Sequence, residues 1–399
     1  MEVAAFYLPS LGRKEEIEQG MAGKRTDLYQ RMLVELSEQI GFMDEHGYYG
    51  AGTTEHHFHI EGEEVSTNPV LLNLYFGLRT KRMKFGQLGN VLPCLNPVNR
   101  AEDIAIASQM LQGRVFAGFA RGYQGRWVNV LGQHYGLGEP GKGEDYEELK
   151  RSLFEEHFDI MMTAWKHDTF SYHGKHWQIP TPGIQWPAAK TSRAYGKGVD
   201  ENGIIQEIGI APGLYNNQIP DLFMPFATSE RSIQWAMERG VVPVTIMTHP
   251  DVVRGHFLAG QEAAQRAGLD YKYGQGMAMS REVIVADTDE EAERIARDAG
   301  AFIWCNFFQP FGFNAAIATP EEKNPFTVPN SFEAISERGL VIHGSPDTVN
   351  RKLEALFKQL PVDYFWMFIY NHMPHDALMR SLELLTTRVW PNFSDKIRG

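Results

Sequence analysis

The sequence is poor in cysteine and has no excess of basic residues. Only two cysteines, Cys94 and Cys305, occur among the 399 residues, and they lie far apart in the chain. This argues against a disulfide framework or a thiolate metal site and is typical of a protein of the reducing cytosol. The 38 Lys and Arg residues are outnumbered by 50 Asp and Glu residues. Without a basic stripe, a nucleic-acid partner is not expected.

Long hydrophobic runs are also absent. No stretch approaches the ~18 uninterrupted apolar residues of a membrane span. The opening segment, MEVAAFYLPSLGRKEEIEQG, lacks the basic and apolar regions of a secretory signal. We therefore expect a soluble, cytoplasmic protein that does not bind membranes. Hydrophobic residues make up 43% of the chain, which is ample for a large packed core.

Short apolar runs alternate with longer segments of helical periodicity, a pattern typical of βα units around a parallel sheet. Eight runs predict strands, and each is followed by at least one helical stretch: 3–8, 48–53, 83–88, 114–120, 222–226, 241–245, 277–286 and 364–370. The count favours a (β/α)8, TIM-like barrel over an open doubly wound sheet. We predict that residues 1–399 form a single barrel domain.

Two irregular regions interrupt this rhythm, near 166–220 and 307–331. The first predicts a β-hairpin followed by an extended loop inserted in the barrel. Loops of such length are usually functional, so both regions are candidate lids or pocket walls. The competing interpretation is decoration without a catalytic role.

Three histidines follow the second predicted strand, in Thr54-Glu55-His56-His57-Phe58-His59. Barrel enzymes carry their sites at the C-terminal ends of strands, so these side chains should reach the barrel mouth. Three interpretations stay open: a metal site, proton transfer by one histidine with its neighbour packed structurally, or polar residues at a wet rim. No HExxH helix accompanies the cluster, and we predict no metal.

A phosphate site is indicated by two other loops. Arg121 and Gly122 follow the fourth predicted strand, and an arginine fork there suits an anion. The spacing is not GxGxxG, and no immediate helix is predicted. After the fifth strand, Ala227-Thr228-Ser229-Glu230-Arg231-Ser232 opens a helix, whose free N–H groups attract phosphate. Simple capping by Ser229 is the commoner explanation of such a run.

The third predicted strand ends in Gly86-Gln87-Leu88-Gly89-Asn90. Its glycines would let the backbone approach a flat ring, although a bulge is the more frequent reason for glycines at a strand end.

Taken in order, these motifs resemble the luciferase-like flavin-dependent monooxygenases. The matching pieces run through roughly residues 1–390: Glu55-His56-His57-Phe58, Asn68-Pro69, Val91-Leu92-Pro93, Asn96-Pro97-Val98, Arg121-Gly122, Ser229 to Gly240 and Gly344-Ser345-Pro346. The C-terminal stretch 344–393 is similar to members that act on cyclic ketones.

The resemblance implies an enzyme that uses reduced FMN, supplied by a separate flavin reductase, and O2. Through a flavin peroxide it would oxygenate a small hydrophobic aldehyde, ketone or aromatic compound. It implies His56 as catalytic residue with His57 in support, a cis peptide at Leu88-Gly89 and a homodimer. The predicted cofactor-binding residues are Leu88, Gly89, Asn90, Arg121, Gly122, Tyr123, Ala227, Thr228, Ser229 and Ser232.

Three departures from luciferase itself make light emission an unexpected activity. Thr228 replaces a glutamate, the segment after Gly122 lacks an acidic pattern, and residues 180–220 have no luciferase counterpart. The main alternative is a deazaflavin-dependent hydride transfer on the same fold. A flavin-storage protein and a metal hydrolase are further alternatives.

Overall fold

The computed structural model describes residues 1–138 and 143–397, and within them a nine-stranded sheet forms the centre of the fold. Its strand order is β10-β9-β11-β1-β2-β3-β4-β7-β8, and β8 also pairs with β9. The last pairing closes a ring of eight strands, which confirms the predicted (β/α)8 barrel. Those strands are β1 (Glu2–Tyr7), β2 (Gly50–Thr53), β3 (Lys84–Val91), β4 (Val115–Ala120), β7 (Asp221–Pro225), β8 (Val242–Thr245), β9 (Ala278–Val285) and β11 (Tyr364–Ile369).

Helices follow the strands as the periodicity predicts. The longer ones are α2 (Thr26–Glu45), α3 (Pro69–Gly77), α4 (Pro97–Met110), α6 (Glu144–Lys166), α8 (Glu230–Glu238), α9 (Pro250–Arg266), α10 (Asp289–Phe302), α12 (Pro346–Gln359) and α13 (His375–Leu384). α3 begins at an Asn-Pro pair, where the Asn68 side chain accepts a hydrogen bond from Leu71 N. α4 begins in the same way, because Asn96 accepts from Val98 N and Asn99 N. Among the described residues, no helix is long and apolar enough to cross a bilayer.

The described residues group into two compact units. The first contains most residues of the barrel strands, with α1 (Lys14–Ile17) to α3 and α8 to α13. The second, Asn90–Val115 and Phe119–Asp221, contains α4 to α7, the first irregular region and the terminal residues of β3, β4 and β7. That the whole chain is one domain stays a prediction.

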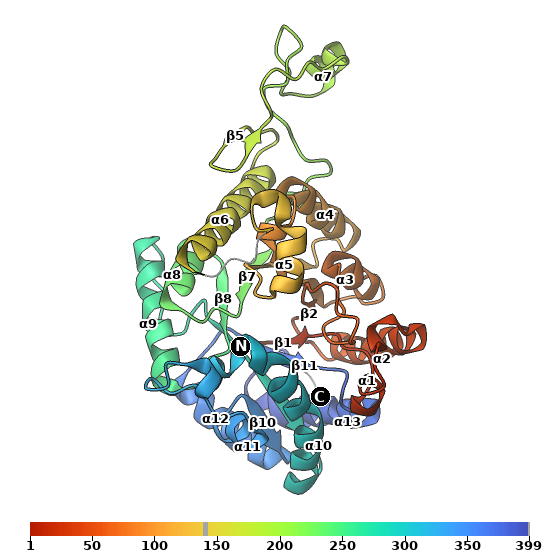
Figure 1. Ribbon diagram of the computed structural model, residues 1–399, viewed down its shortest axis with the longest axis vertical. Helices are drawn as coiled ribbons and strands as arrows, with labels where there is room; N and C mark the ends of the chain where they lie inside the picture. The colour runs from red at the N-terminus through yellow and green to blue at the C-terminus, as the bar shows by residue number, and fades with distance from the viewer. Residues whose placement is uncertain (139–142, 398–399) are drawn as a thin grey trace. The chain divides into compact units, whose positions relative to one another are not determined.

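Within the second unit, the region after α6 begins with the predicted hairpin. β5 (Tyr172–His173) pairs antiparallel with β6 (Gln178–Ile179). The Glu156 carboxylate, on α6, accepts hydrogen bonds at 2.8 to 3.0 Å from the backbone N–H groups of Lys175, His176 and Trp177. The chain then runs out to the short helix α7 (Ala189–Tyr195), at the far end of this excursion from α6 (Figure 1).

Several elements were not predicted, among them α1 and also α7, which lies where only an extended loop was expected. A seven-residue helix, α5 (Gly125–Leu131), begins three residues after Gly122, so the expectation of no immediate helix there is wrong. The second irregular region is a series of short helical turns followed by α11 (Phe332–Glu337). A ninth strand, β10 (Val341–Gly344), lies next to α11 and α12 (Figure 1) and pairs with the C-terminal half of β9.

The barrel interior is filled by aromatic rings. Phe116, Phe223 and Trp366 pack at centroid distances of 5.2 to 5.5 Å. One layer closer to the C-terminal ends of the strands, Phe6 lies 5.5 Å from Phe226. Trp366 of β11 contacts rings on β4 and β7, and Phe6 of β1 contacts Phe226 just after β7. These pairs join strands that are not neighbours in the sheet, so the rings lie inside the barrel.

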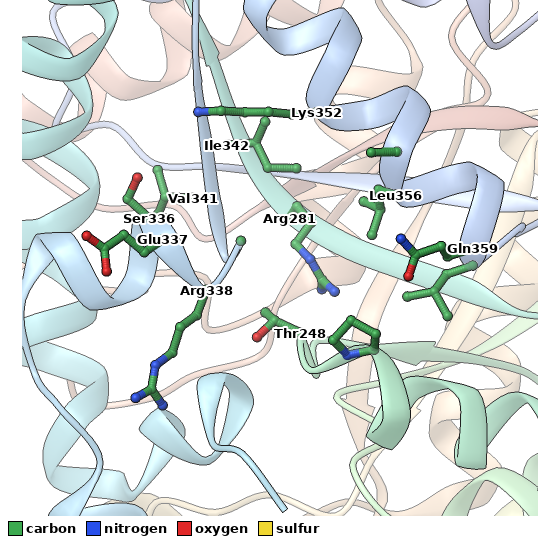
Figure 2. A pocket seen from close by; sticks show the side chains of 14 residues that line it. Thr248, Arg281, Ser336, Glu337, Arg338, Val341, Ile342, Lys352, Leu356 and Gln359 are labelled. Atoms are coloured by element: carbon green, nitrogen blue, oxygen red, sulfur yellow. The ribbon is translucent and has the colours of Figure 1, made fainter.

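The outer face of β9 carries a buried arginine where its pairing changes from β8 to β10. The Arg281 guanidinium donates to the carbonyl oxygens of Ile246 and Met247, just beyond β8, and to its neighbour Ser280. It thereby satisfies backbone groups that β8 no longer pairs. Figure 2 shows this side chain among the residues that line a pocket on the outside of the barrel, with Thr248 and Lys352.

Candidate active site

His56 lies three residues beyond the end of β2, in the position predicted for a barrel-mouth residue. Its backbone N–H donates to Ser66 O at 2.9 Å, which ties the strand end to the end of the following loop. The side chain is 7% exposed, and Nδ1 lies 3.3 Å from Glu64 Oε1. Burial lowers the pKa of His56 well below its usual range, and the nearby His59 and His57 lower it further. His56 is therefore neutral at pH 7.

The carboxylate beside His56 influences which ring nitrogen carries the proton. An acidic oxygen close to Nδ1 favours a proton on Nδ1, which leaves a lone pair on Nε2. Glu64 itself has a left-handed backbone, with φ of 44°, and its side chain is 1% exposed. A non-glycine residue adopts this conformation at a cost of about 1 kcal/mol or more. The loop thus uses an unfavourable backbone angle to place a carboxylate against His56.

The preceding residue, Glu63, makes a second buried carboxylate–histidine pair. Its Oε2 lies 3.0 Å from His372 Nε2, beyond β11, and accepts a hydrogen bond from Ser10 Oγ at 3.0 Å, beyond β1. Three strand ends are therefore joined through one carboxylate. The loop is fixed further by hydrogen bonds from Leu11 N to Gly62 O and from Val65 N to Pro9 O.

The other two histidines of the cluster have different surroundings. The His57 side chain is 19% exposed and its Nε2 lies 3.4 Å from Glu55 Oε1. His59 is buried, with its ring 5.7 Å from that of His56 and 5.5 Å from that of Phe307. In the described part of the chain, no three His, Cys, Asp or Glu side chains gather as a metal ion would need.

The peptide bond between Leu88 and Gly89 is cis, as the resemblance implied. It lies within β3, the neighbour of β2 in the barrel. Space here is tight, because a Cβ atom on Gly52 of β2 would lie 2.8 Å from Leu88 Cδ1. Glycine at position 52 therefore allows the Leu88 side chain to pack against the strand that carries His56.

The start of α8 presents hydroxyl groups at its N-terminus. Ser229 is the N-cap and accepts a hydrogen bond from Ser232 N at 3.3 Å, while its Oγ lies 3.0 Å from Ser232 Oγ. The predicted capping is thus confirmed. Thr228 and Ser229 are exposed, and Ala227 is buried, with its N–H bonded to Val244 O. Exposed hydroxyls and first-turn N–H groups are the donors that a phosphate needs.

The remaining predicted residues belong to the second unit. Asn90 is buried and accepts a hydrogen bond from Arg100 Nη1 at 2.6 Å. The Arg121 side chain is 33% exposed, with Nη1 3.8 Å from Glu147 Oε2. Gly122 has φ of 76°, and a Cβ atom there would lie 2.7 Å from Val91 Cγ1. The Tyr123 hydroxyl accepts a hydrogen bond from Gln124 Nε2.

The buried polar residues that join the loop after β2 to its surroundings were not predicted: Ser10, Glu63, Glu64 and His372. The only sequence signal for the two acids is the run Glu61-Gly62-Glu63-Glu64, which looks like an exposed polar loop. Its glycine, with φ of 109°, gives a weak indication of a tight turn.

Comparisons with known proteins agree with the fold and with the family that the sequence resembles. A family model described as luciferase-like monooxygenase matches residues 20–364. The 3,6-diketocamphane 1,6-monooxygenase of Pseudomonas putida is 28% identical over 341 residues, covering 81% of this chain and 84% of that protein. The oxygenase component of a flavin-dependent trigonelline monooxygenase from Acinetobacter baylyi is 23% identical over 377 residues, covering 90% of both chains.

A solved structure supports the same fold. It is the oxygenating constituent of 3,6-diketocamphane monooxygenase from Pseudomonas putida in complex with FMN, with a TM-score of 0.75 and 22% identity over 99% of both chains. The family model alone matches far more than half of the residues. The chain belongs to the luciferase-like monooxygenase family.

Proposed function

We propose that the protein is the oxygenase of a two-component system, which uses reduced FMN and O2 to oxygenate a small hydrophobic aldehyde, ketone or aromatic compound. Family membership supports the reaction class, and the names of the diketocamphane and trigonelline relatives support a flavin and a carbonyl or ring substrate. The observation that carries the proposal is His56, a buried, neutral histidine at the barrel mouth, with Glu64 Oε1 3.3 Å from its Nδ1.

The donor groups predicted from the sequence are proposed to hold FMN. The phosphate contacts are assigned to Arg121 and to Thr228, Ser229 and Ser232, because a partly exposed guanidinium and a hydroxyl-rich helix start both suit a phosphate. Backbone around Leu88, Gly89 and Asn90, with Gly122, Tyr123 and Ala227, is proposed to contact the rest of the cofactor. When bound, reduced FMN would supply the electrons that activate O2.

His56 is proposed to hold or move a proton at Nε2. We assign the proton of the neutral ring to Nδ1, which lies 3.3 Å from Glu64 Oε1, so that Nε2 is the acceptor. The low pKa of His56 means that the ring gives up an accepted proton readily. Neutrality also keeps a charge, with its hydration shell, out of the reacting space. His57 supports the loop from the rim through its contact with Glu55.

Three further features belong to the same proposal. A separate flavin reductase supplies the reduced FMN, as the word "component" in the trigonelline relative's name supports. Two copies of the chain form a homodimer. The protein works in the cytoplasm, where both cysteines would remain the free thiols seen in the structure.

The decisive experiment is a titration with FMN, first oxidised and then photoreduced under nitrogen, followed by O2. Tight binding of reduced FMN and product formation from a ketone or aldehyde would support the oxygenase. Binding of a deazaflavin coenzyme in place of FMN would refute it in favour of hydride transfer. The variant His56→Ala should bind FMN normally and form product at least about 100-fold more slowly; unchanged turnover would remove His56 from the mechanism.

A further inference from the structure

Glu282 is a buried acid on the inner face of the barrel. β9 and β11 pair in parallel register, with Glu282 opposite Phe368. The Phe368 ring lies 6.0 Å from that of Phe226, which follows β7 on another side of the barrel, so it points inward. In-register neighbours in a parallel pair point to the same face of a sheet. Glu282 therefore also points inward, close to the C-terminal ends of the strands.

The residues around Glu282 leave room for its carboxyl group and connect it to the histidine cluster. A Cβ atom on Gly300, in α10, would lie 2.7 Å from Glu282 Oε2, so a larger residue there would displace the carboxyl group. Trp304 Nε1 donates to the same oxygen at 3.2 Å. Trp304 belongs to the π-helical segment Ile303–Phe308, whose Phe307 contacts the ring of His59. π-Helical turns are frequent at functional sites.

No cation neutralises Glu282 within the described residues. Arg281, its neighbour in the chain, points to the opposite face of β9 and donates to backbone carbonyl groups. Burial without a cation raises the pKa of Glu282 to about 8, an effect that the Trp304 hydrogen bond only partly offsets. The carboxyl group is therefore neutral at pH 7. A neutral carboxyl group has an O–H that can donate a hydrogen bond. Trp304 donates to Glu282 and so leaves this O–H available.

We propose that Glu282 donates a hydrogen bond to the carbonyl oxygen of an aldehyde or ketone substrate. The proposal rests on the proposed oxygenase function and narrows its substrate class to carbonyl compounds. A donor on the carbonyl oxygen withdraws electron density from the carbonyl carbon, which makes that carbon more open to nucleophilic attack. Among aromatic walls, such a donor also orients any substrate with an acceptor at the matching position.

The proposal is tested by comparing two ligands of the same shape. Camphor carries a carbonyl group, and its parent hydrocarbon, camphane, does not. Their dissociation constants would be measured on the FMN-loaded protein under nitrogen, for wild type, Glu282→Leu, Glu282→Gln and the control Ser280→Ala. Ser280 lies on the same strand and face, one layer deeper, in register with Trp366.

Glu282→Leu should weaken camphor binding about three- to tenfold and leave camphane binding unchanged, because one neutral hydrogen bond is lost. Glu282→Gln retains an N–H donor and should weaken camphor binding less than Glu282→Leu does. Ser280→Ala should not alter the ratio of the camphor and camphane dissociation constants. Equal weakening of both ligands would identify a merely structural residue and overturn the proposal. If the leucine variant does not fold, the glutamine variant decides in the same way.

A second readout needs neither flavin nor substrate. The infrared difference spectrum between wild type and Glu282→Gln at pH 7 should contain the C=O band of a protonated carboxyl group, shifted in heavy water. A carboxylate band in its place would overturn the proposal. If this band and the camphor preference are found but reduced FMN and O2 give no product, the oxygenase function fails while the hydrogen bond stands.

Discussion

Replacing Glu282 by glutamine should remove a large pH dependence from the stability of the protein. The folded-state pKa is about 8, against 4.5 for an ordinary glutamate. Between these values the folded state keeps a proton that the unfolded state has lost, so raising the pH favours unfolding. The free energy of unfolding therefore falls by roughly 1.4 kcal/mol per pH unit, or by about 5 kcal/mol between the two pKa values. Above the folded pKa the contribution no longer changes.

Urea unfolding from about pH 5 to about pH 9 measures this contribution directly. The free energy of unfolding of Glu282→Gln minus that of wild type should rise steadily through the window and level off near its upper end. A matched control is Glu333→Gln. The Arg297 hydrogen bond holds the pKa of that exposed carboxyl at about 2, so it is ionised in both states throughout. Parallel curves for wild type and Glu282→Gln would show that Glu282 is already ionised when folded.

Three other outcomes are expected. Glu156→Ala should destabilise the hairpin by about 2 to 4 kcal/mol, because three backbone N–H groups lose their acceptor; fast amide exchange confined to residues 174–178 would support this, and unchanged protection would not. Gly122→Ala should lower the melting temperature through a loss of roughly 1 to 3 kcal/mol, since φ is 76° and the new Cβ atom meets Val91; an unchanged melting temperature would contradict it. Burial lowers the pKa of His157 to about 4. Between pH 6.5 and about 4 only the unfolded state binds the proton, so the free energy of unfolding should fall as the pH drops through this range. In acid unfolding curves His157→Gln should show a smaller fall, and an equally steep fall would refute the assignment.

The regular part of the fold was predictable because each element carries its own local signal. The eight barrel strands are short apolar runs, and the helices between them have a helical spacing of apolar residues, as in α12 (Pro346–Gln359). Helix starts are local as well, because the Asn68 and Asn96 side chains accept hydrogen bonds from backbone N–H groups two or three residues further along the chain. β10 was missed because Val341–Gly344 is too short for a period, and its pairing depends on β9, far away in the chain.

The site was predictable only where position along a strand decides it. His56 follows from its place after β2, and the cis bond at Leu88–Gly89 followed from the resemblance. The partner of His56 did not, because Glu64 reaches it only through a left-handed backbone angle at a non-glycine residue. The sequence also does not indicate that the neighbouring residues Arg281 and Glu282 have opposite surroundings. Arg281 points outward and donates to backbone carbonyl groups, whereas Glu282 points inward and accepts a hydrogen bond from the Trp304 indole.

His56 and Glu282 are two buried titratable residues of the barrel, and burial shifts their pKa values in opposite directions. Burial lowers the pKa of the histidine and raises that of the acid, so both are neutral near pH 7. A charged group would retain water, and water destroys reactive oxygen intermediates. The two neutral groups instead offer one acceptor, at His56 Nε2, and one donor, at Glu282. Burial of Glu282 therefore has two effects. It destabilises the folded protein above pH 4.5, and it keeps a proton on the carboxyl group that can be donated to the substrate.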